Sequence, residues 1–513
     1  MIVTTHGSTV QGVDASLISV EANVLDNGFN FFMVGLPDSA IKESIHRIES
    51  AIKHYGYYFP RKKVVVNLAP GDVRKEGSAF DLPITLTLLG ASGQLNPDKL
   101  ADYVILGELS LDGKLRPIKG VLPIAIETRK RGFKGFILPK QNAEEAAIVN
   151  NLDVIGVESL MEAIDFIEGR KHIEPVHYDT REYFFDALND FEEDFAEVQG
   201  QENIKRALEI AAAGGHNVVM IGPPGAGKTM LAKRIPSILP PPTLQEALET
   251  TKIHSVAGLL GKNSRLVPKR PFRSPHHTVS DVALVGGGSN PQPGEISLAH
   301  NGVLFLDELP EFKRTVLEVM RQPLEERKVT ISRARVTVDY PANFMLVSSM
   351  NPCPCGYHNH PEKSCVCGPG VVQRYLNKIS GPLMDRIDLH VEVTPVSFDQ
   401  MTSAVQTESS EEIRKRVIQA REIQEKRFEG YPKVHNNAMM PVELLKKVCE
   451  LDVVGKNLLK MAMQKLGLSA RAYDRILKVS RTIADLAGSE KILPEHLAEA
   501  IQYRSLDREN WAN

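Results

Sequence analysis

The residues best suited to carry chemistry form a phosphate-binding pattern near the middle of the chain. The segment GPPGAGKT, residues 222–229, has the spacing G-x-x-x-x-G-K-S/T, follows an apolar run at 217–221 and precedes the helix-like stretch MLAKRI. Glycines at this spacing let backbone N–H groups turn inward around phosphate oxygens, and the N-terminus of the next helix adds its positive dipole. The pattern predicts a nucleotide-binding loop made of Gly222, Pro223, Pro224, Gly225, Ala226, Gly227, Lys228 and Thr229.

A second motif complements this loop. In VLFLDE, residues 303–308, Asp307 ends an apolar run, where its carboxylate can hold Mg²⁺ together with the Thr229 hydroxyl. Lys228 is expected to reach the β and γ phosphates of ATP, and Glu308 to polarise the attacking water as a general base. The alternatives are a chance glycine turn and an acidic pair that merely opens a helix. The presence of both motifs favours the nucleotide site.

Apolar segments must place the two motifs beside each other. Runs that are apolar on nearly every residue lie at 217–221, 303–306 and 344–348, which is typical of central strands in a parallel sheet covered by helices on both faces. Residues 387–393 alternate between apolar and polar, so we expect a strand with one less buried face. From about residue 400 the spacing becomes helical, as in the series Ile413, Val417, Ala420 and Ile423.

The N-terminal part of the chain, up to about residue 170, has alternating strand and helix signals. Residues 63–70 predict a strand that ends at a Pro-Gly turn. Residues 171–195 show no clean period, and we interpret them as a linker. One helix is expected where four isoleucines share a face, namely Ile41, Ile45, Ile48 and Ile52.

The overall composition is that of an ordinary globular protein without a strong charge. The chain has 513 residues, which predicts roughly three domains, and its 61 basic and 64 acidic residues give a net charge of −3. A nucleic-acid partner would therefore have to meet a local basic patch. The N-terminus lacks the features of a signal peptide and no apolar run is long enough to cross a bilayer, so we expect a cytoplasmic protein without membrane contact.

Four of the five cysteines cluster within a Pro/Gly-rich segment. His358 and His360 lie between two C-x-C pairs in this segment. Four thiolates can satisfy a tetrahedral Zn²⁺ ion, although the usual spacing is C-x-x-C. We favour a structural zinc loop at 353–367 over a set of reduced cytosolic thiols. The ligands would be Cys353, Cys355, Cys365 and Cys367.

Three long segments carry a family resemblance. Residues 196–232 around the phosphate loop, 271–312 ending in DELPEF, and 380–393, SGPLMDRIDLHVEV, closely resemble the magnesium-chelatase-like AAA+ proteins known as ComM or YifB. The resemblance extends over nearly the whole chain and implies an α/β protein. The domains that it implies are an N-terminal α+β Lon-protease-like domain at 1–170, an AAA+ P-loop parallel-sheet core at 196–400 after the linker, and a C-terminal helical lid at 401–513.

The resemblance also implies roles for residues outside the two motifs. Asn351 is similar to the sensor that positions the attacking water. Arg386 resembles the arginine finger that acts on ATP held by a neighbouring subunit, and Arg374 is the second choice for that role. Arg471 resembles the lid sensor that contacts the γ-phosphate. Each would supply a donor where charge develops in phosphoryl transfer. The alternative is that these arginines, with Arg475, are surface or ion-pair residues.

The first 170 residues resemble the fold of Lon-type protease domains, which raises the question of proteolysis. Ser78 stands where the nucleophile would lie, but the position of the lysine base falls on Leu122. Lys119 lies three residues earlier, and one helical turn would displace its amine by several ångströms. We expect a protease-like scaffold without proteolysis, with a Ser78–Lys119 pair as the alternative.

The implied partner is DNA. The resemblance implies a hexameric ring that loads on single-stranded or branched DNA. The ring would drive branch migration in recombination, as in natural transformation. Residues 329–340 predict two strands around a basic turn with Arg333 and Arg335, where ring helicases carry a pore hairpin. Basic groups at a pore neutralise phosphates without reading bases. A second basic segment contributes Lys269, Arg270, Arg273, His276 and His277.

Two other functions remain open at this point. The AAA+ core also resembles the motor subunit of magnesium chelatase, although a protease-like N-terminal domain is not part of that motor's pattern. A protein-remodelling or Lon-like protease ATPase is the third class, because an AAA+ engine does not by itself name its substrate. The basic segments would then be solvated loops. DNA-stimulated ATP hydrolysis separates the first function from the other two.

Overall fold

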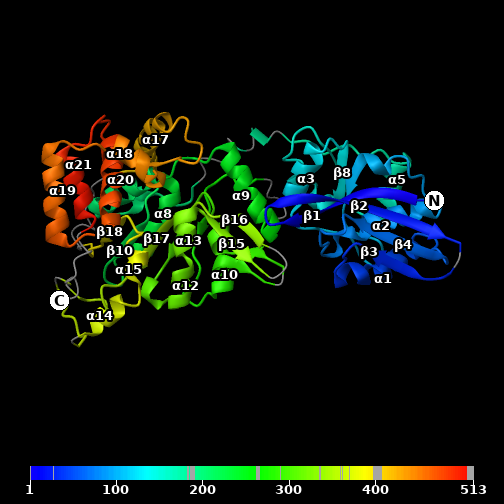
Figure 1. Ribbon diagram of the computed structural model, residues 1–513, viewed down its shortest axis with the longest axis horizontal. Coiled ribbons are helices and arrows are strands. Elements are labelled where there is room, and N and C mark those ends of the chain that lie inside the picture. The colour runs from blue at the N-terminus through cyan, green and yellow to red at the C-terminus, as the bar shows by residue number, and fades with distance from the viewer. Residues whose placement is uncertain are drawn as a thin grey trace. The chain divides into compact units, whose positions relative to one another are not determined.

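The structure, a computed structural model, contains two compact units. The first consists of Met1–Asp186 and Leu244–Pro268, and the second of Ala187–Thr243 and Lys269–Asn513. Each has its own main sheet (Figure 1). The described residues are 2–26, 28–178, 180–181, 184, 191–260, 266–288, 290–333, 337–358, 360, 362–368, 370–396 and 407–504.

The first unit is built on a seven-stranded mixed sheet with the order β3-β4-β2-β1-β5-β8-β9. β2 runs antiparallel to both β1 and β4, and the other neighbours are parallel. The strands are β1 (Ile2–Gln11), β2 (Asp14–Leu25), β3 (Phe31–Val34), β4 (Lys63–Ala69), β5 (Tyr103–Ile105), β8 (Gly135–Pro139) and β9 (Asp153–Val157), with a separate hairpin of β6 (Glu108–Leu109) and β7 (Leu115–Arg116). The helices are α1 (Ser39–His54), α2 (Asp81–Ala91), α3 (Val121–Lys130), α4 (Ala143–Ala146) and α5 (Leu160–Ile167).

Local sequence explains the elements predicted here. Helix α1 begins where the Asp38 carboxylate accepts the backbone N–H of Ile41 at 2.8 Å. Its isoleucine face is buried as predicted, with only Ile45 half-buried. The predicted strand at 63–70 is β4, whose alternate residues are buried. The isoleucine face and the segment ending at the Pro-Gly turn therefore both identified their elements correctly.

Helix α9 (Leu244–Ala257) packs on α3 and belongs to the first unit, although it lies inside the range predicted for the AAA+ core. The Ser255 hydroxyl on α9 donates to Glu145 Oε1 at 2.5 Å, and the backbone N–H of Leu122 donates to the same oxygen at 3.0 Å. Burial raises the pKa of Glu145. A buried, hydrogen-bonded carboxyl group thus joins α9 to α3 and α4, which the sequence pattern alone does not reveal.

The second unit contains a five-stranded parallel sheet in the order β11-β14-β17-β10-β18. Its three predicted apolar runs are β10, β14 and β17, and all three are buried throughout. The strands are β10 (Val218–Ile221), β11 (Phe272–Arg273), β14 (Val303–Leu306), β17 (Met345–Met350) and β18 (Leu389–Glu392). The neighbouring helices are α7 (Glu202–Gly214) and α8 (Lys228–Ile238), and the predicted basic hairpin is β15 (Lys328–Ser332) with β16 (Thr337–Pro341).

Residues 387–393 contain a strand as expected, but the polar face of β18 is exposed only at Glu392. His390 is 3% exposed and the preceding Asp388 is 1% exposed. The backbone N–H of His390 donates to the Tyr503 carbonyl at 2.8 Å, and the Arg504 guanidinium donates to the Ile387 carbonyl. The end of the C-terminal helical region therefore covers the polar face of this edge strand.

The C-terminal region is helical as predicted. Ser409 and Glu412 form a capping box at the start of the first of these helices, whose residues Ile413, Val417 and Ala420 are buried. Ile423 is the exception, at 37% exposed. The helices are α17 (Ser410–Arg427), α18 (Val442–Val448), α19 (Val453–Leu466), α20 (Ala470–Leu486) and α21 (Pro494–Gln502).

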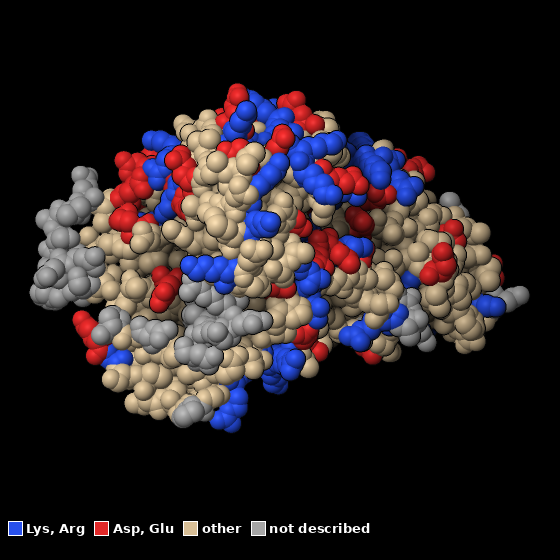
Figure 2. Space-filling model, turned by 60° about the vertical axis from the view of Figure 1, so that its left-hand side comes forward, with Lys and Arg blue, Asp and Glu red and all other residues tan. Residues whose placement is uncertain are grey.

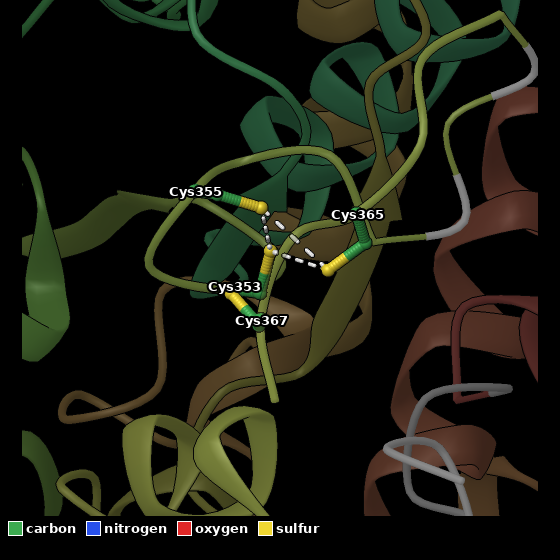
Figure 3. A group of neighbouring side chains, drawn as sticks. All are labelled: Cys353, Cys355, Cys365 and Cys367. Carbon is green, nitrogen blue, oxygen red and sulfur yellow. Dashed lines mark hydrogen bonds between the residues drawn. The ribbon is translucent and has the colours of Figure 1, made fainter. Parts of the chain in front are cut away.

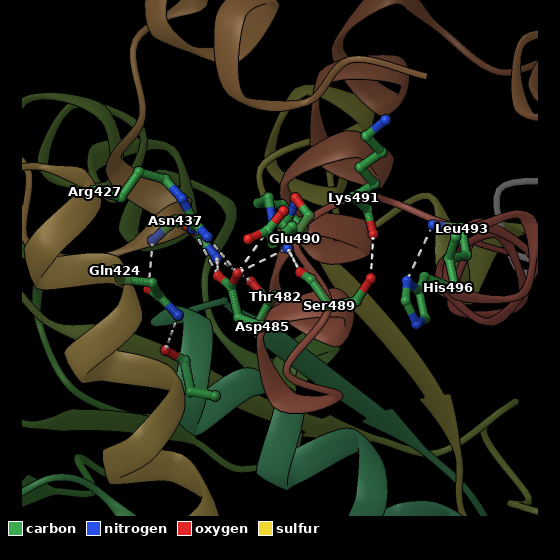
Figure 4. A network of polar contacts seen from close by, with 12 residues as sticks. Gln424, Arg427, Asn437, Thr482, Asp485, Ser489, Glu490, Lys491, Leu493 and His496 are labelled. Atoms are coloured by element: carbon green, nitrogen blue, oxygen red, sulfur yellow. Dashed lines mark hydrogen bonds and ion pairs between the residues drawn. The ribbon is translucent and has the colours of Figure 1, made fainter. Parts of the chain in front are cut away.

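A buried polar network holds these helices to the core (Figure 4). The Asp485 carboxylate accepts hydrogen bonds from Arg427 at 2.8 Å, Asn437 at 2.8 Å and Arg481 at 3.0 Å. Gln424 on α17 donates to the Ala213 carbonyl of α7 at 3.1 Å. Removing one partner of a buried ion pair typically costs about 3–5 kcal/mol. The network therefore fixes the helical region to the element that precedes the phosphate loop.

The surface does not carry one dominant charge. On the face shown in Figure 2, Lys and Arg side chains are mixed with Asp and Glu side chains, which agrees with the net charge of −3. Among the described residues, no helix is long and apolar enough to cross a membrane.

Candidate active site

The phosphate loop lies between β10 and α8. Gly225 and Gly227 have φ angles of +81° and +85°, a conformation that side chains disfavour. A Cβ on Gly222 would lie 2.3 Å from the Val393 carbonyl oxygen, so only glycine fits there. Lys228 Nζ donates to the Gly222 and Pro223 carbonyls at 2.8 and 2.9 Å. The lysine is thus placed inside the loop that is expected to receive phosphate.

Burial dominates the electrostatics of this lysine. It lowers the pKa of Lys228, while the carboxylates of Asp307 and Glu308 act in the opposite direction. These two acids follow β14, next to β17 in the sheet. The parallel sheet thereby brings the two sequence motifs to the same edge, where the carboxyl ends of its strands meet.

A hydroxyl and a carboxylate lie together at the position predicted for Mg²⁺. Thr229 Oγ1 donates to Asp307 Oδ2 at 2.7 Å, and the Ser349 hydroxyl of β17 donates to Asp307 Oδ1. Oxygen ligands of this kind fit Mg²⁺, which prefers one or two carboxylates together with phosphate oxygens and water. Sequence analysis missed Ser349, because nothing in the run VSSM marks it as a partner of Asp307.

Glu308 has a strained backbone and an accessible side chain. Its φ of +53° is unusual for a residue other than glycine, and its side chain is 58% exposed. His277 Nδ1 lies 3.6 Å from Glu308 Oε2, and the His277 ring packs against that of His276 with centroids 4.1 Å apart. The two histidines, which we had assigned to a basic DNA segment, thus lie beside the acidic motif.

Asn351 lies directly after β17 and faces the phosphate loop. Its Oδ1 accepts a hydrogen bond from Lys228 Nζ at 3.2 Å. The side chain is therefore within reach of the groups that would contact ATP. This placement is the one that the sensor role requires.

Comparisons with known proteins decide the family. Three family models match the chain: "Magnesium chelatase, subunit ChlI" at residues 194–401, "Subunit ChlI of Mg-chelatase" at 20–142, and the C-terminal model of the same subunit at 407–504. The "Competence protein ComM" of Haemophilus influenzae is 42% identical over 97% of this chain and 96% of its own length. The "Uncharacterized protein YifB" of Escherichia coli is 43% identical over 98% and 97%. This chain belongs to the ComM/YifB family of magnesium-chelatase-like AAA+ ATPases.

Membership of this family confirms the fold class inferred from sequence. A ComM/YifB chain is an AAA+ ATPase, and its nucleotide site takes ATP and Mg²⁺. The chain is also 30% identical over 154 residues to "Lon protease 2" of Bacillus subtilis, covering 27% of this chain. Both findings fit an α/β protein with a Lon-like part, a P-loop core and a helical lid.

In the Lon-like part of this ComM/YifB chain, Ser78 and Lys119 contact different partners. The Ser78 hydroxyl donates to Glu108, not to an amine. Lys119 lies against Gly258, where a Cβ would be 2.7 Å from its Cε, and Leu122 is fully buried. These contacts support the interpretation of a scaffold without proteolysis.

The structure places the two candidate arginine fingers very differently. Arg386 is 5% exposed, its Nη2 lies 2.5 Å from Glu325 Oε1 of the same chain, and its Nη1 donates to the Pro382 carbonyl at 2.5 Å. Arg374 on α14 (Val371–Leu376) is exposed and forms no ion pair with the described residues. A finger must reach ATP in another subunit. Arg374 has the more exposed side chain of the two, and the finger role of either arginine stays a prediction.

The two arginines of α20 also differ. Arg471 is exposed in the first turn, with Nη1 4.0 Å from Asp385 Oδ2. Arg475 Nη1 lies 2.9 Å from Asp388 Oδ1. Burial acts to raise the pKa of Asp388, but Arg475, His216 and a backbone N–H outweigh it and hold that pKa well below its usual range. Arg475 is therefore an ion-pair residue, and the sensor role of Arg471 stays a prediction.

The four clustered cysteines converge on one point (Figure 3). Their Sγ atoms all lie within 4.8 Å of one another. Cys353 lies 3.3 Å from Cys355 and 3.7 Å from Cys365, and the latter two are 3.5 Å apart. Sulfurs around a tetrahedral Zn²⁺ with bonds of about 2.3 Å are about 3.8 Å apart. The cluster can therefore hold a metal ion, whereas Cys449 lies elsewhere in the core.

Most of the second basic segment has intramolecular roles. Arg270 donates to the carbonyls of Pro240 at 2.6 Å and Asn301 at 2.8 Å. Arg273 forms a two-point ion pair with Glu295 at 2.6 and 2.7 Å. Lys269 Nζ lies over the Phe191 ring at 5.6 Å. These contacts make the segment structural, a role that its composition did not indicate. Arg333 is exposed, and Arg335 lies outside the described residues.

Proposed function

We propose that this ATPase forms a hexameric ring and moves DNA strands, with branch migration during recombination or DNA uptake as its reaction. The Haemophilus relative is named a competence protein, which supports a role in DNA uptake. The structural observation that carries the proposal is the hairpin β15–β16. It lies in the chain between Asp307–Glu308 and Asn351, so both ends of the insertion lead to residues of the nucleotide site.

The hairpin packs through one apolar face and has an exposed arginine after its first strand. Its apolar face, made by Val329, Ile331, Val338 and Tyr340, is buried. On the other face Lys328 pairs with Asp339 at 2.8 Å. Arg333 follows β15 at the turn and is exposed. A packed hairpin with an exposed arginine after its first strand is suited to contact phosphates along a strand without reading bases.

The residues of the site have separate tasks during hydrolysis. Lys228 exchanges its loop carbonyls for phosphate oxygens, and Asn351 orients the attacking water. Glu308 takes the proton from that water. Thr229 and Asp307 would hold Mg²⁺, which would neutralise charge on the β and γ phosphates. The backbone of the phosphate loop holds these groups in place throughout.

ATP hydrolysis by the purified protein with and without single-stranded, duplex and branched DNA tests the function. We expect stimulation by single-stranded or branched DNA. Stimulation instead by a porphyrin and its chelatase partners would favour the chelatase motor. Degradation of casein that depends on ATP would favour a protease, and no stimulation by any DNA would contradict the proposal.

The hairpin tip provides a sharper prediction. Changing Arg333 and Arg335 together to glutamate should weaken DNA binding for all sequences and lower the slope of log affinity against log salt by about 0.7–0.9 per lost phosphate contact. Basal ATP hydrolysis should persist, and its stimulation by DNA should be lost. Binding curves over a salt series measure this. The control is Lys456→Glu with Lys460→Glu, which changes the charge equally on α19. Equal slopes in both variants would place the DNA contacts elsewhere.

We also propose that the cysteine cluster binds one Zn²⁺ per chain. Elemental analysis of chelator-washed protein should find one equivalent, because the four sulfurs already have near-tetrahedral separations. Cys365→Ser combined with Cys367→Ser should lose the metal, and the matched change Cys449→Ser should keep it. Metal-free protein with four freely titrating thiols would rule out this site.

A further inference from the structure

The cysteine loop contacts the phosphate loop directly. Gly356 lies so close to Pro224 that a Cβ at residue 356 would be 2.5 Å from Pro224 Cδ and 3.1 Å from Cγ. Gly356 has a φ of +84°, and its N–H donates to the Cys353 carbonyl at 3.0 Å. The tight turn that carries Cys353 and Cys355 is therefore packed against the nucleotide-binding loop.

The same segment reaches the site at two further points. Asn351, two residues before Cys353, accepts the hydrogen bond from Lys228 at 3.2 Å. The backbone N–H of Gly222 donates to the Met350 carbonyl at 3.2 Å. Residues 350–356 thus contact the phosphate loop at Gly222, Pro224 and Lys228. Cys353, within this segment, is fully buried.

The turn lies outside the regular elements. Residues 351–358 belong to no helix or strand, so a bond from a metal ion to each sulfur would add a direct constraint on the turn. A metal ion would join Cys353 and Cys355 to Cys365 and Cys367, about a dozen residues away in the chain. Closing that loop would restrict the backbone conformations available to the turn.

We propose that metal binding by the four cysteines fixes this turn against Pro224 and thereby sets the phosphate loop and Asn351 in the geometry that binds and hydrolyses ATP. Gly356 is the positioning residue that transmits the effect. The proposal rests on the zinc site proposed above, and it makes nucleotide binding depend on the metal. Both sites lie in the second unit, so the effect needs no movement between units.

Gly356→Ala tests the contact without removing a ligand. It should retain one zinc per chain and bind a fluorescent ATP analogue more weakly. Its kcat/KM should fall about 100-fold, the order expected when reacting groups are misplaced by about 1 Å. The control is Gly430→Ala, at a φ of +89° with nothing within 4 Å, which has similar backbone strain but no neighbour. Equal kinetics in the two variants would overturn the proposal.

A double variant separates this contact from general damage. In a Pro224→Ala background, Cδ and Cγ are absent and the next nearest atom, the Pro224 nitrogen, is 3.7 Å from the added Cβ. Gly356→Ala should therefore reduce analogue affinity much less in that background than in the wild type. Equal reductions in both backgrounds would mean that residue 356 acts by another route, contrary to the proposal.

Metal removal provides a test that does not depend on any variant folding. Zinc is chelated from the wild-type protein, analogue affinity is measured, and Zn²⁺ is added back. Affinity should fall and then recover. If the protein contains no metal when purified, both the proposed zinc site and this inference are wrong. Protein that holds zinc but binds the analogue equally well after chelation would overturn the inference alone and leave the zinc site standing.

Discussion

The variant Glu308→Gln should bind ATP with unchanged affinity and hydrolyse it at least about 100-fold more slowly, since a positioned general base contributes about 10²–10⁴ to a rate. The amide cannot accept a proton from water, but it keeps the shape of the side chain. Lys228→Ala should differ by losing tight nucleotide binding, because it removes the charge inside the phosphate loop. Analogue titration and single-turnover hydrolysis measure the two effects separately.

Glu311→Gln is the matched control for this change. Glu311 lies three residues further along the chain and pairs with Lys378 at 3.2 Å. Its replacement should leave the hydrolysis rate close to that of the wild type. Normal turnover by Glu308→Gln would show that another group activates the water, and His277, 3.6 Å from Glu308, would be the first to test.

Arg374→Ala should leave ATP binding intact and reduce kcat by about 10³–10⁵, the contribution of an arginine finger. The reason is its exposure on α14. Mixing Arg374→Ala subunits with Glu308→Gln subunits should restore part of the activity, because the second variant retains its arginine and the first retains its general base. Hydrolysis rates across a series of mixing ratios measure this restoration.

Arg386→Ala provides the contrasting case. Its guanidinium is buried against Glu325, so its loss should lower the unfolding temperature as well as the rate. Arg386 would be the finger if Arg374→Ala is fully active and if a folded Arg386→Ala is inactive alone but active in mixed rings. Arg386 would then have to separate from Glu325 to reach ATP.

The nucleotide site could be predicted because its parts are local in sequence. Each motif follows an apolar run, and a parallel sheet necessarily brings the ends of neighbouring strands to one edge. The contacts Thr229–Asp307 and Lys228–Asn351 follow from that arrangement. The fold class followed from the same runs together with the family resemblance.

Side chains whose role depends on a distant partner could not be predicted. Arg270 and Arg273 lie in a segment whose composition suggests phosphate binding. Their guanidinium groups instead bind carbonyl oxygens and Glu295. The sequence of β18 alternates, yet Arg504 and the chain around it cover its polar face. Likewise, contacts between segments far apart in the sequence, such as that of Ser255 with Glu145, show that α9 belongs with the first unit.

The most direct test of the motor function is ATP-dependent branch migration by the purified protein on a labelled three- or four-stranded DNA junction. We predict that the wild-type protein converts the junction to separated duplex products only when ATP is present and hydrolysed. Glu308→Gln should bind the junction and ATP but leave the junction intact. Conversion of the junction without ATP hydrolysis, or vigorous ATP hydrolysis that no DNA stimulates and that moves no strand, would contradict the account.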